Sequence, residues 1–417
     1  MSLLEWLAIA VTILTVYALI KRLETRLVLF TAGFVLCLVS MDPLSALNSF
    51  AKSMTNNSLV MAICSSMGFA FIANYTQCDR SLVHYLAAPI RGLGVFLIPI
   101  CTAVTFFINI AIPSAAGCAA AVGSTLIPVM LRAGIKPAAA AAAVMGGTIG
   151  SYLSPGTSHN PFVAEMAGID VMDFIAFHAM WSILCGVILV VGLLVVCMFL
   201  GDHKGEKVDV EAQKNDNFKP NPIKAIMPLV PITILVVGNV WLPVIKMGVA
   251  QAMLIGVTYT MIVTRINPQN AFKEFFNGAG KGYGNVLGII ISAGVFAAGL
   301  REAGVVDALI EALKQANEYA RVGGALGTWA MAVLMGSGDA ATFAFNEAVT
   351  PHAAEFGMTI SELGNTVMCA AQLGRTMSPI AGVVILLAGM SQVSPIDLVK
   401  RTAVPMITAW FILILFL

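Results

Sequence analysis

Two stretches decide the fold: GSYLSP at residues 150–155 and GRTMSP at residues 374–379. Each lies inside a long apolar run and ends in a proline, which removes a backbone donor and interrupts a helix. Six further pairs of identical residues occur in the same order in the two halves of the chain, and the alignment needs one single-residue shift. The pairs are Ser114 with Ser337, Pro128 with Pro351, Gly134 with Gly357, Met145 with Met368, Met166 with Met390 and Asp173 with Asp397. We interpret this pattern as an internal repeat whose copies each carry an interrupted apolar segment.

The composition is that of a polytopic integral membrane protein. Of the 417 residues, 59% are hydrophobic and only 11% are charged, and the mean hydropathy is +0.89. Soluble proteins carry about 25% charged residues, so this chain cannot cover a water-soluble body of its size. A net charge of +1 gives no reason to expect nucleic acid as a partner.

The hydropathy predicts an all-α fold of two repeats, each with five spans and one re-entrant helical hairpin. The first repeat covers 1–201, a polar linker 202–222, and the second repeat 223–417. The expected spans are 3–20, 27–41, 58–75, 138–168, 173–200, 223–242, 247–264, 283–300, 361–391 and 395–417. Those at 138–168 and 361–391 are expected to be broken helices, and the hairpins are expected at 93–133 and 322–356.

The basic residues orient these spans. With the N-terminus outside, 17 of the 23 Lys and Arg residues fall inside, 5 fall outside, and Arg375 is left within the membrane. This asymmetry is the one that the positive-inside rule expects, so the linker is predicted to be cytoplasmic and both termini periplasmic. Five crossings separate Ser114 from Ser337, which inverts the second repeat. Inverted repeats with interrupted helices are typical of secondary transporters, whose sites lie near the midplane between the repeats.

The breaks themselves indicate a binding site. They fall at 113–117, 150–160, 336–340 and 374–379. Broken helices persist in lipid only when they are buried in protein or line a cavity. There, half-helix N-termini offer N–H groups to anions and half-helix C-termini offer carbonyls to cations. Such a site suits a small anion with an optional cation. The alternative is that the small residues serve only helix packing.

Five charged or titratable residues lie near the breaks. Arg375 matches a carboxylate through its planar fork, and the alternative is a structural ion pair with Asp339 or Glu347. Asp339 could carry a proton or bind Na⁺, and the alternative is an N-cap. His159, Glu165 and Glu347 are further candidates for coupling, against ordinary hydrogen-bonding roles.

The second interrupted helix also carries a family resemblance. Residues 373–384 read LGRTMSPIAGVV, 388–390 read AGM and 394–402 read SPIDLVKRT, with GSGDA at 336–340 and SAAG at 114–117. These motifs closely resemble the DcuC family of bacterial anaerobic C4-dicarboxylate transporters, in the wider ion transporter superfamily. The resemblance implies transport of succinate, fumarate, malate or aspartate class anions across the inner membrane. The superfamily implies a homodimer with scaffold and transport domains, and an elevator motion that supports exchange or ion-coupled symport.

In related transporters the hairpin tips and unwound helices hold the substrate and often Na⁺. Carried onto this chain, the expected substrate-binding residues are Ser114, Ala115, Ala116, Gly117, Ser154, Pro155, Gly156, Thr157, Ser158, Asn160, Ser337, Gly338, Asp339, Ala340, Arg375, Thr376 and Ser378. Sodium-coupled members often carry Ser-Asn-Thr at the hairpin tips, and this chain departs from that pattern at both. Proton coupling or exchange therefore stays open beside Na⁺, and no other cofactor is expected.

Three rival functions follow from the same residues. A cation/proton antiporter would use Asp339 and Glu347 as ion ligands. A carrier of another small organic anion would use the same breaks. An intramembrane serine hydrolase would need Ser337 with a base such as His352, but Ser337 lacks the Gly-x-Ser-Gly setting of a nucleophile. We therefore expect a transporter and not an enzyme.

Overall fold

The structure is a computed structural model that describes residues 3–87, 94–205, 218–308 and 320–416. Every regular element within these ranges is a helix. Among the described residues, eight helical segments are long and apolar enough to cross a membrane: Leu3–Ile20, Asn57–Tyr75, Gly94–Ala111, Ala115–Arg132, Val171–Phe199, Pro222–Val240, Pro268–Glu302 and Pro395–Leu415. The predicted class, an all-α polytopic membrane protein, is confirmed.

The helices before the linker fill most of the first half of the chain. They are α1 (Leu3–Ile20), α2 (Thr25–Val39), α3 (Pro43–Met54), α4 (Asn57–Tyr75), α5 (Cys78–Ala87), α6 (Leu97–Ala111), α7 (Ala115–Arg132), α8 (Pro137–Gly147), α9 (His159–Ala167) and α10 (Val171–Phe199). Two 3₁₀ turns join them, η2 (Gly94–Phe96) and η3 (Gly150–Leu153).

The second half continues in the same way. Its α-helices are α11 (Pro222–Ile226), α12 (Val230–Val240), α13 (Val249–Thr264), α14 (Pro268–Lys281), α15 (Gly288–Glu302), α17 (Ala320–Met335), α18 (Gly338–Ala348), α19 (Ile360–Thr376), α20 (Gly382–Ser391) and α21 (Pro395–Phe416). The shorter elements are the 3₁₀ turns η4 (Met227–Leu229), η5 (Pro243–Ile245) and η8 (Thr350–Phe356) and the π-helical turn η6 (Gly282–Leu287).

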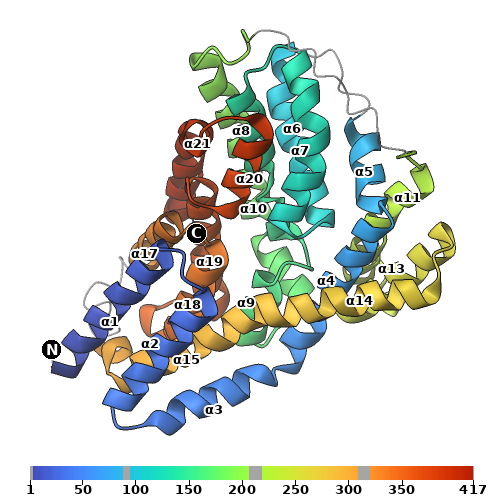
Figure 1. Cartoon of the computed structure of the whole chain (residues 1–417). Coiled ribbons are helices and arrows are strands. Elements are labelled where there is room, and N and C mark those ends of the chain that lie inside the picture. The colour runs from blue at the N-terminus through green and yellow to red at the C-terminus, as the bar shows by residue number, and fades with distance from the viewer. Residues whose placement is uncertain (1–2, 88–93, 206–217, 309–319, 417) are drawn as a thin grey trace.

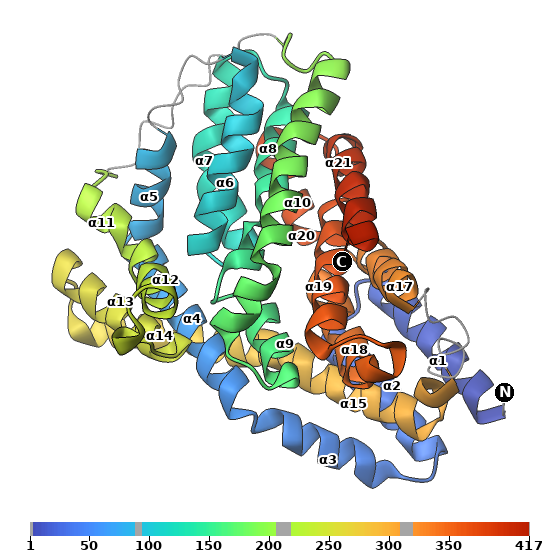
Figure 2. The same cartoon turned by 180° about the vertical axis from the view of Figure 1, so that it is seen from behind.

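The helices form an upright bundle above one long rod. In Figure 1, α6, α7, α8, α20 and α21 stand side by side, and α14, in yellow, and α15, in light orange, run beneath them as a continuous helix. The α1–α3 segment packs at one end of this rod, and α4, α5 and α11–α13 gather at the other, as the reverse view also shows (Figure 2). The bundle thus meets the rod where the interrupted helices lie.

The rod formed by α14 and α15 contains the π-helical turn η6 between these two helices. A π-turn breaks the regular α-helical hydrogen-bond pattern and is frequent at functional sites. Arg26 of α2 donates from Nη1 to the Gly284 carbonyl oxygen at 2.6 Å, and the Tyr283 hydroxyl donates to the Met54 carbonyl oxygen at 3.2 Å. Neighbouring helices α2 and α3 therefore hold the irregular turn in place.

Glycine allows α2 and α15 to touch backbone to backbone. A Cβ atom on Gly33 would lie 2.4 Å from the Val295 carbonyl oxygen, and one on Gly299 would lie 2.5 Å from the Gly33 carbonyl oxygen. Real side chains do not reach such distances, so both positions require glycine. Small residues drive helix association in lipid because they permit this approach.

Helix α8 forms the centre of the bundle. Every residue from Ala138 to Gly147 is buried, and residues 138–143 are all alanine. Because alanine adds little bulk, the neighbouring helices α6, α7, α20 and α21 can surround α8 closely. This arrangement fixes the position of the unwound segment that follows α8.

The structure corrects one predicted boundary. The span expected at 283–300 is only the second part of the 35-residue helical segment Pro268–Glu302. Charged side chains in α14, such as those of Lys273 and Glu274, lower the local hydropathy and hide this extension. Hydropathy detects only the apolar half of the rod, whereas the backbone is helical through both halves.

Other predicted bounds differ in length. The spans expected at 27–41 and 247–264 are the 15-residue α2 and the 16-residue α13. Both arms of the hairpin expected at 93–133 are 18 residues long, which is enough to cross a membrane, and residue 93 lies outside the described residues. Residues 206–217 of the expected linker also lie outside them. The division into inverted repeats stays a prediction.

The glycine contact between α2 and α15 can be tested by stability. We expect Gly33→Ala to lower the melting temperature of the purified protein, because overpacking of this kind costs about 1–3 kcal/mol. Gly389→Ala is the matched control, since a Cβ there meets nothing within 4 Å. Thermal unfolding followed by tryptophan fluorescence measures both variants. Equal melting temperatures for the two would contradict the proposed backbone contact.

Candidate functional site

A cavity of about 350 Å³ lies where the interrupted helices meet. Its walls come from four interruptions and from the rod side of the molecule. The lining residues are Ile63, Met67, Pro113, Ser114, Ala115, Ala116, Ser151, Gly156, Thr157, Ser158, His159, Val286, Gly336, Ser337, Gly338, Asp339, Gln372, Arg375, Ala381, Gly382 and Val383. The structure therefore brings together in one cavity most of the residues that the sequence singled out.

Two helices begin at this cavity with the same local chemistry. The Ser114 hydroxyl oxygen accepts from the Gly117 N–H at 3.2 Å, and the Ser337 hydroxyl oxygen accepts from the Ala340 N–H at 3.2 Å. Each serine is thus the N-cap of its helix, α7 or α18. Their O–H groups remain able to donate, and the helix N-termini add partial positive charge.

The tip between α17 and α18 depends on Gly336. Its φ of +69° is in the left-handed region, which glycine adopts without a steric penalty. A Cβ atom there would also lie 2.9 Å from the Ala381 nitrogen. The glycine therefore lets the turn that carries Ser337 and Asp339 approach the start of α20.

Arg375 lies in the last turn of α19 and lines the cavity, with only 8% of the residue exposed. Its Nε is buried and has no hydrogen-bond partner among the described residues. No ion pair joins it to Asp339 or Glu347 within the described part of the chain, and Asp339 pairs with His159. Arg375 is therefore a buried guanidinium with an unused donor at the cavity.

His159, Asp339 and Gln372 form a cluster on the cavity wall. His159 Nε2 lies 2.9 Å from Asp339 Oδ1 and 2.8 Å from Gln372 Nε2, and Gln372 Nε2 donates to Asp339 Oδ1 at 3.4 Å. The imidazole also stacks on Phe343, with ring centroids 5.3 Å apart. These contacts join α9, α18 and α19, so the cluster ties the two halves of the chain together.

The unwound stretch before α9 is held by buried amides. Asn160 Nδ2 donates to the carbonyl oxygens of Tyr152 and Ser154, both at 2.8 Å. Because that amide nitrogen faces two acceptors, Asn160 Oδ1 is left to accept from His178 Nε2 at 3.2 Å. Asn160 is completely buried and does not line the cavity. Its position supports the unwound backbone behind the cavity wall.

Asn109 joins two of the interruptions. Its Oδ1 accepts from the Ser151 N–H at 2.7 Å, and its Nδ2 donates to the Ile112 carbonyl oxygen at 2.9 Å. The sequence analysis missed Asn109, as it missed His178 and Gln372. The signal that could have found them is a polar side chain inside an otherwise apolar helix.

Several expected site residues lie behind the cavity wall. The Thr376 hydroxyl donates to the Gln372 carbonyl oxygen at 2.8 Å, and the Ser378 hydroxyl donates to the Val333 carbonyl oxygen at 2.7 Å. Besides Asn160, the others that do not line the cavity are Gly117, Ser154, Pro155 and Ala340. Of these, Gly117 and Ala340 contribute the N–H groups that bond to the capping serines.

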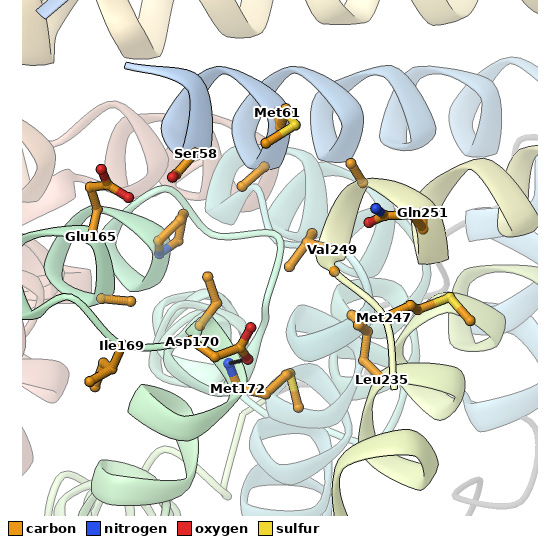
Figure 3. A pocket seen from close by; sticks show the side chains of 16 residues that line it. Ser58, Met61, Glu165, Ile169, Asp170, Met172, Leu235, Met247, Val249 and Gln251 are labelled. Carbon is orange, nitrogen blue, oxygen red and sulfur yellow. Dashed lines mark hydrogen bonds between the residues drawn. The ribbon is translucent and has the colours of Figure 1, made fainter. Parts of the chain in front are cut away.

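Two coupling candidates lie elsewhere. Glu165 lines a second cavity of about 260 Å³, together with Asp170 and Gln251 (Figure 3). A Cβ atom on Gly294 of α15 would lie 3.5 Å from Glu347 Oε1, so Glu347 faces the rod. No three His, Cys, Asp or Glu side chains gather into a metal-binding group within the residues that the structure describes.

The chain is similar to known transporters along its whole length. Residues 5–417 match the family model described as DcuC, C4-dicarboxylate anaerobic carrier. A putative uncharacterized transporter of Haemophilus influenzae is 45% identical over 64% of this chain and 99% of its own length. The probable anaerobic C4-dicarboxylate transporter DcuC of Vibrio cholerae is 28% identical over 96% of this chain and 94% of its own.

A solved structure shares the fold. The chain matches Neisseria gonorrhoeae MtrF with a TM-score of 0.70 and 15% identity, over 96% of both chains. Its title describes MtrF as illuminating a class of antimetabolite efflux pumps. At this identity the likeness concerns the fold alone.

The support that Asn160 gives to the unwound stretch can be tested. We expect Asn160→Ala to lower the free energy of unfolding by about 3 kcal/mol, because it leaves two carbonyls and an imidazole without their buried partner. The control is Asn270→Ala, since Asn270 is exposed on α14. Chemical or thermal unfolding of both purified variants measures the difference, and an Asn160 variant as stable as the control would refute the role.

Proposed function

Since the chain belongs to the DcuC family of C4-dicarboxylate anaerobic carriers, we propose that it is a secondary active transporter of C4-dicarboxylates of the succinate, fumarate, malate and aspartate class. It is a transporter and not an enzyme. The single observation that carries the substrate assignment is Arg375, a buried guanidinium at the cavity whose Nε has no partner among the described residues.

Arg375 would hold one carboxylate of the substrate. Its planar fork fits two carboxylate oxygens at once, and a site within the membrane excludes water that would weaken the contact. Burying the guanidinium costs free energy, and a bound anion offsets this cost. Binding of an anionic substrate in the cavity is therefore favoured.

The two helix starts would hold the second carboxylate. The hydroxyls of Ser114 and Ser337 line the cavity, and the first turn of α7, which holds no acidic side chain, directs its partial positive charge toward it. The first turn of α18 carries Asp339 beside its N-terminal N–H groups. Two anion-binding regions in one cavity suit a dianion better than a monoanion. Ala115, Ala116 and Gly338 leave room for the ligand because they carry little or no side chain.

The cavity walls also support an elevator-type alternating-access mechanism. Four interruptions supply the polar wall, whereas α4 and the rod supply the apolar wall through Ile63, Met67 and Val286. In our proposal the interrupted helices move as the transport domain along this apolar scaffold wall. The substrate would travel with its polar anchors and leave the scaffold side chains behind.

The remaining expectations complete the proposal. The transporter would work as a homodimer in the bacterial inner membrane, with both termini periplasmic. It would catalyse exchange or ion-coupled symport, with protons carried at His159 and Asp339 or with Na⁺ at the hairpin tips. Glu347 and Glu165 would remain coupling candidates of lower rank, because neither lines the cavity.

A cation/proton antiporter is the second candidate function. The observation that favours it is the contact between His159 and Asp339, which places a proton-binding pair in the cavity. An antiporter would change the internal pH of proteoliposomes in response to a Na⁺ gradient without any dicarboxylate. A carrier of another small organic anion would leave the pH unchanged and respond to that anion.

The role of Arg375 can be tested by transport. We expect Arg375→Ala to reduce uptake of labelled succinate and aspartate into proteoliposomes about 100-fold or more, because each hydrogen bond to a charged group contributes about 1.5–3 kcal/mol. Lys273→Ala removes one cation from an exposed position on α14 and is the control. Normal uptake by an Arg375 variant that elutes as a folded protein would sink the assignment.

A further inference from the structure

We propose that the cavity selects a dicarboxylate that also bears an ammonium group, with Asp339 as the counter-ion of that group. The inference deepens the proposed function, on which it rests, by naming the amino dicarboxylates as the preferred substrate class. It starts from the charges that line the cavity. Among the described lining residues, Arg375 is a cation, Asp339 is an anion, and His159 can carry either charge state.

The cation and the anion of the cavity make no direct ion pair. Arg375 and Asp339 line the same space and act on each other electrostatically, yet no ion pair joins them among the described residues. A ligand with a carboxylate and an ammonium supplies a direct partner to both, whereas a plain dianion supplies one to Arg375 alone.

The contacts of His159 reach Asp339 through one ring nitrogen. His159 Nε2 lies 2.9 Å from Asp339 Oδ1 and 2.8 Å from Gln372 Nε2. Nδ1 of the same ring is buried and has no hydrogen-bond partner among the described residues. His159 therefore holds the carboxylate through Nε2 alone.

The carboxylate of Asp339 retains an oxygen for a ligand. Its contacts with His159 and Gln372 both end on Oδ1, and 44% of the side chain is exposed. Oδ2 can therefore accept from an ammonium group, which brings three donors. Asp339 is also not needed to begin α18, because the N-cap of that helix is Ser337. The alternative role considered for Asp339, that of an N-cap, is thus filled by Ser337.

The charge of a plain dianion also acts against its binding. Its second carboxylate meets the like charge of Asp339, whereas an ammonium between the ligand carboxylates and Asp339 replaces this repulsion by attraction. A tenfold preference between the two ligands corresponds to about 1.4 kcal/mol.

The experiment uses the full chain in proteoliposomes loaded with unlabelled L-aspartate. Counterflow of labelled L-aspartate is competed with external L-aspartate or succinate at pH 7.5 and pH 5.5. We expect succinate to need at least about tenfold higher concentration for half-maximal competition. Succinate that competes as well as aspartate at pH 7.5 would overturn the inference.

Asp339→Asn tests the residue itself. We expect the half-competing concentration of aspartate to rise at least about tenfold and that of succinate to fall, so that the preference reverses. Asp173→Asn is the matched control, because Asp173 is exposed in the first turn of α10. Equal losses for both substrates would reject Asp339 as the ammonium partner.

Two further outcomes separate this inference from the proposed function. If neither succinate nor aspartate drives counterflow in the wild-type protein, the proposed function itself fails. If both are carried without preference, the proposed function stands and only the inference fails. Should the Asp339 variant not fold, the wild-type comparison with N-acetyl-aspartate decides, because acetylation removes the ammonium charge and should abolish competition.

Discussion

A backbone that leaves its helix inside a bilayer must find a partner for each N–H and C=O group that it frees, and the rest of the structure depends on this constraint. Asn109 satisfies groups at two of the interruptions, and Asn160 satisfies two further carbonyls in the second of them. Capping serines serve the starts of α7 and α18. Because these partners are side chains of neighbouring helices, the interruptions hold one another in register, and the cavity between them has a defined shape.

The same constraint explains why charge is concentrated in the cavity. An arginine inside the membrane is tolerated when it lines a polar space, and the freed helix ends create such a space. His159, Gln372 and Asp339 bridge elements from both halves of the chain, so side chains at the cavity also make tertiary contacts. A ligand that engages these groups would therefore act on the helices that carry them.

The fold class could be predicted from the sequence because composition and hydropathy depend on averages over many residues. Ser114, Ser337, His159 and Arg375, which local signals of Gly, Ser and Pro pointed to, line one cavity, and their role in binding stays a prediction. The continuous rod could not be predicted, because the charged face of α14 resembles a loop in hydropathy. Gln372 was missed because its role depends on two partners that are distant in sequence.

The π-turn in the rod has a consequence for how the two parts of the molecule are fitted together. Each residue of an α-helix turns the chain by about 100°. The irregular turn at Gly282–Leu287 therefore sets the rotational phase between α14, which packs on α4, and α15, whose glycines meet α2. A one-residue deletion there would leave each half helical but misalign their faces. The π-turn thus fixes how the face of α14 that packs on α4 is rotated relative to the face of α15 that packs on α2. A rod of the same length without this turn would not align both faces.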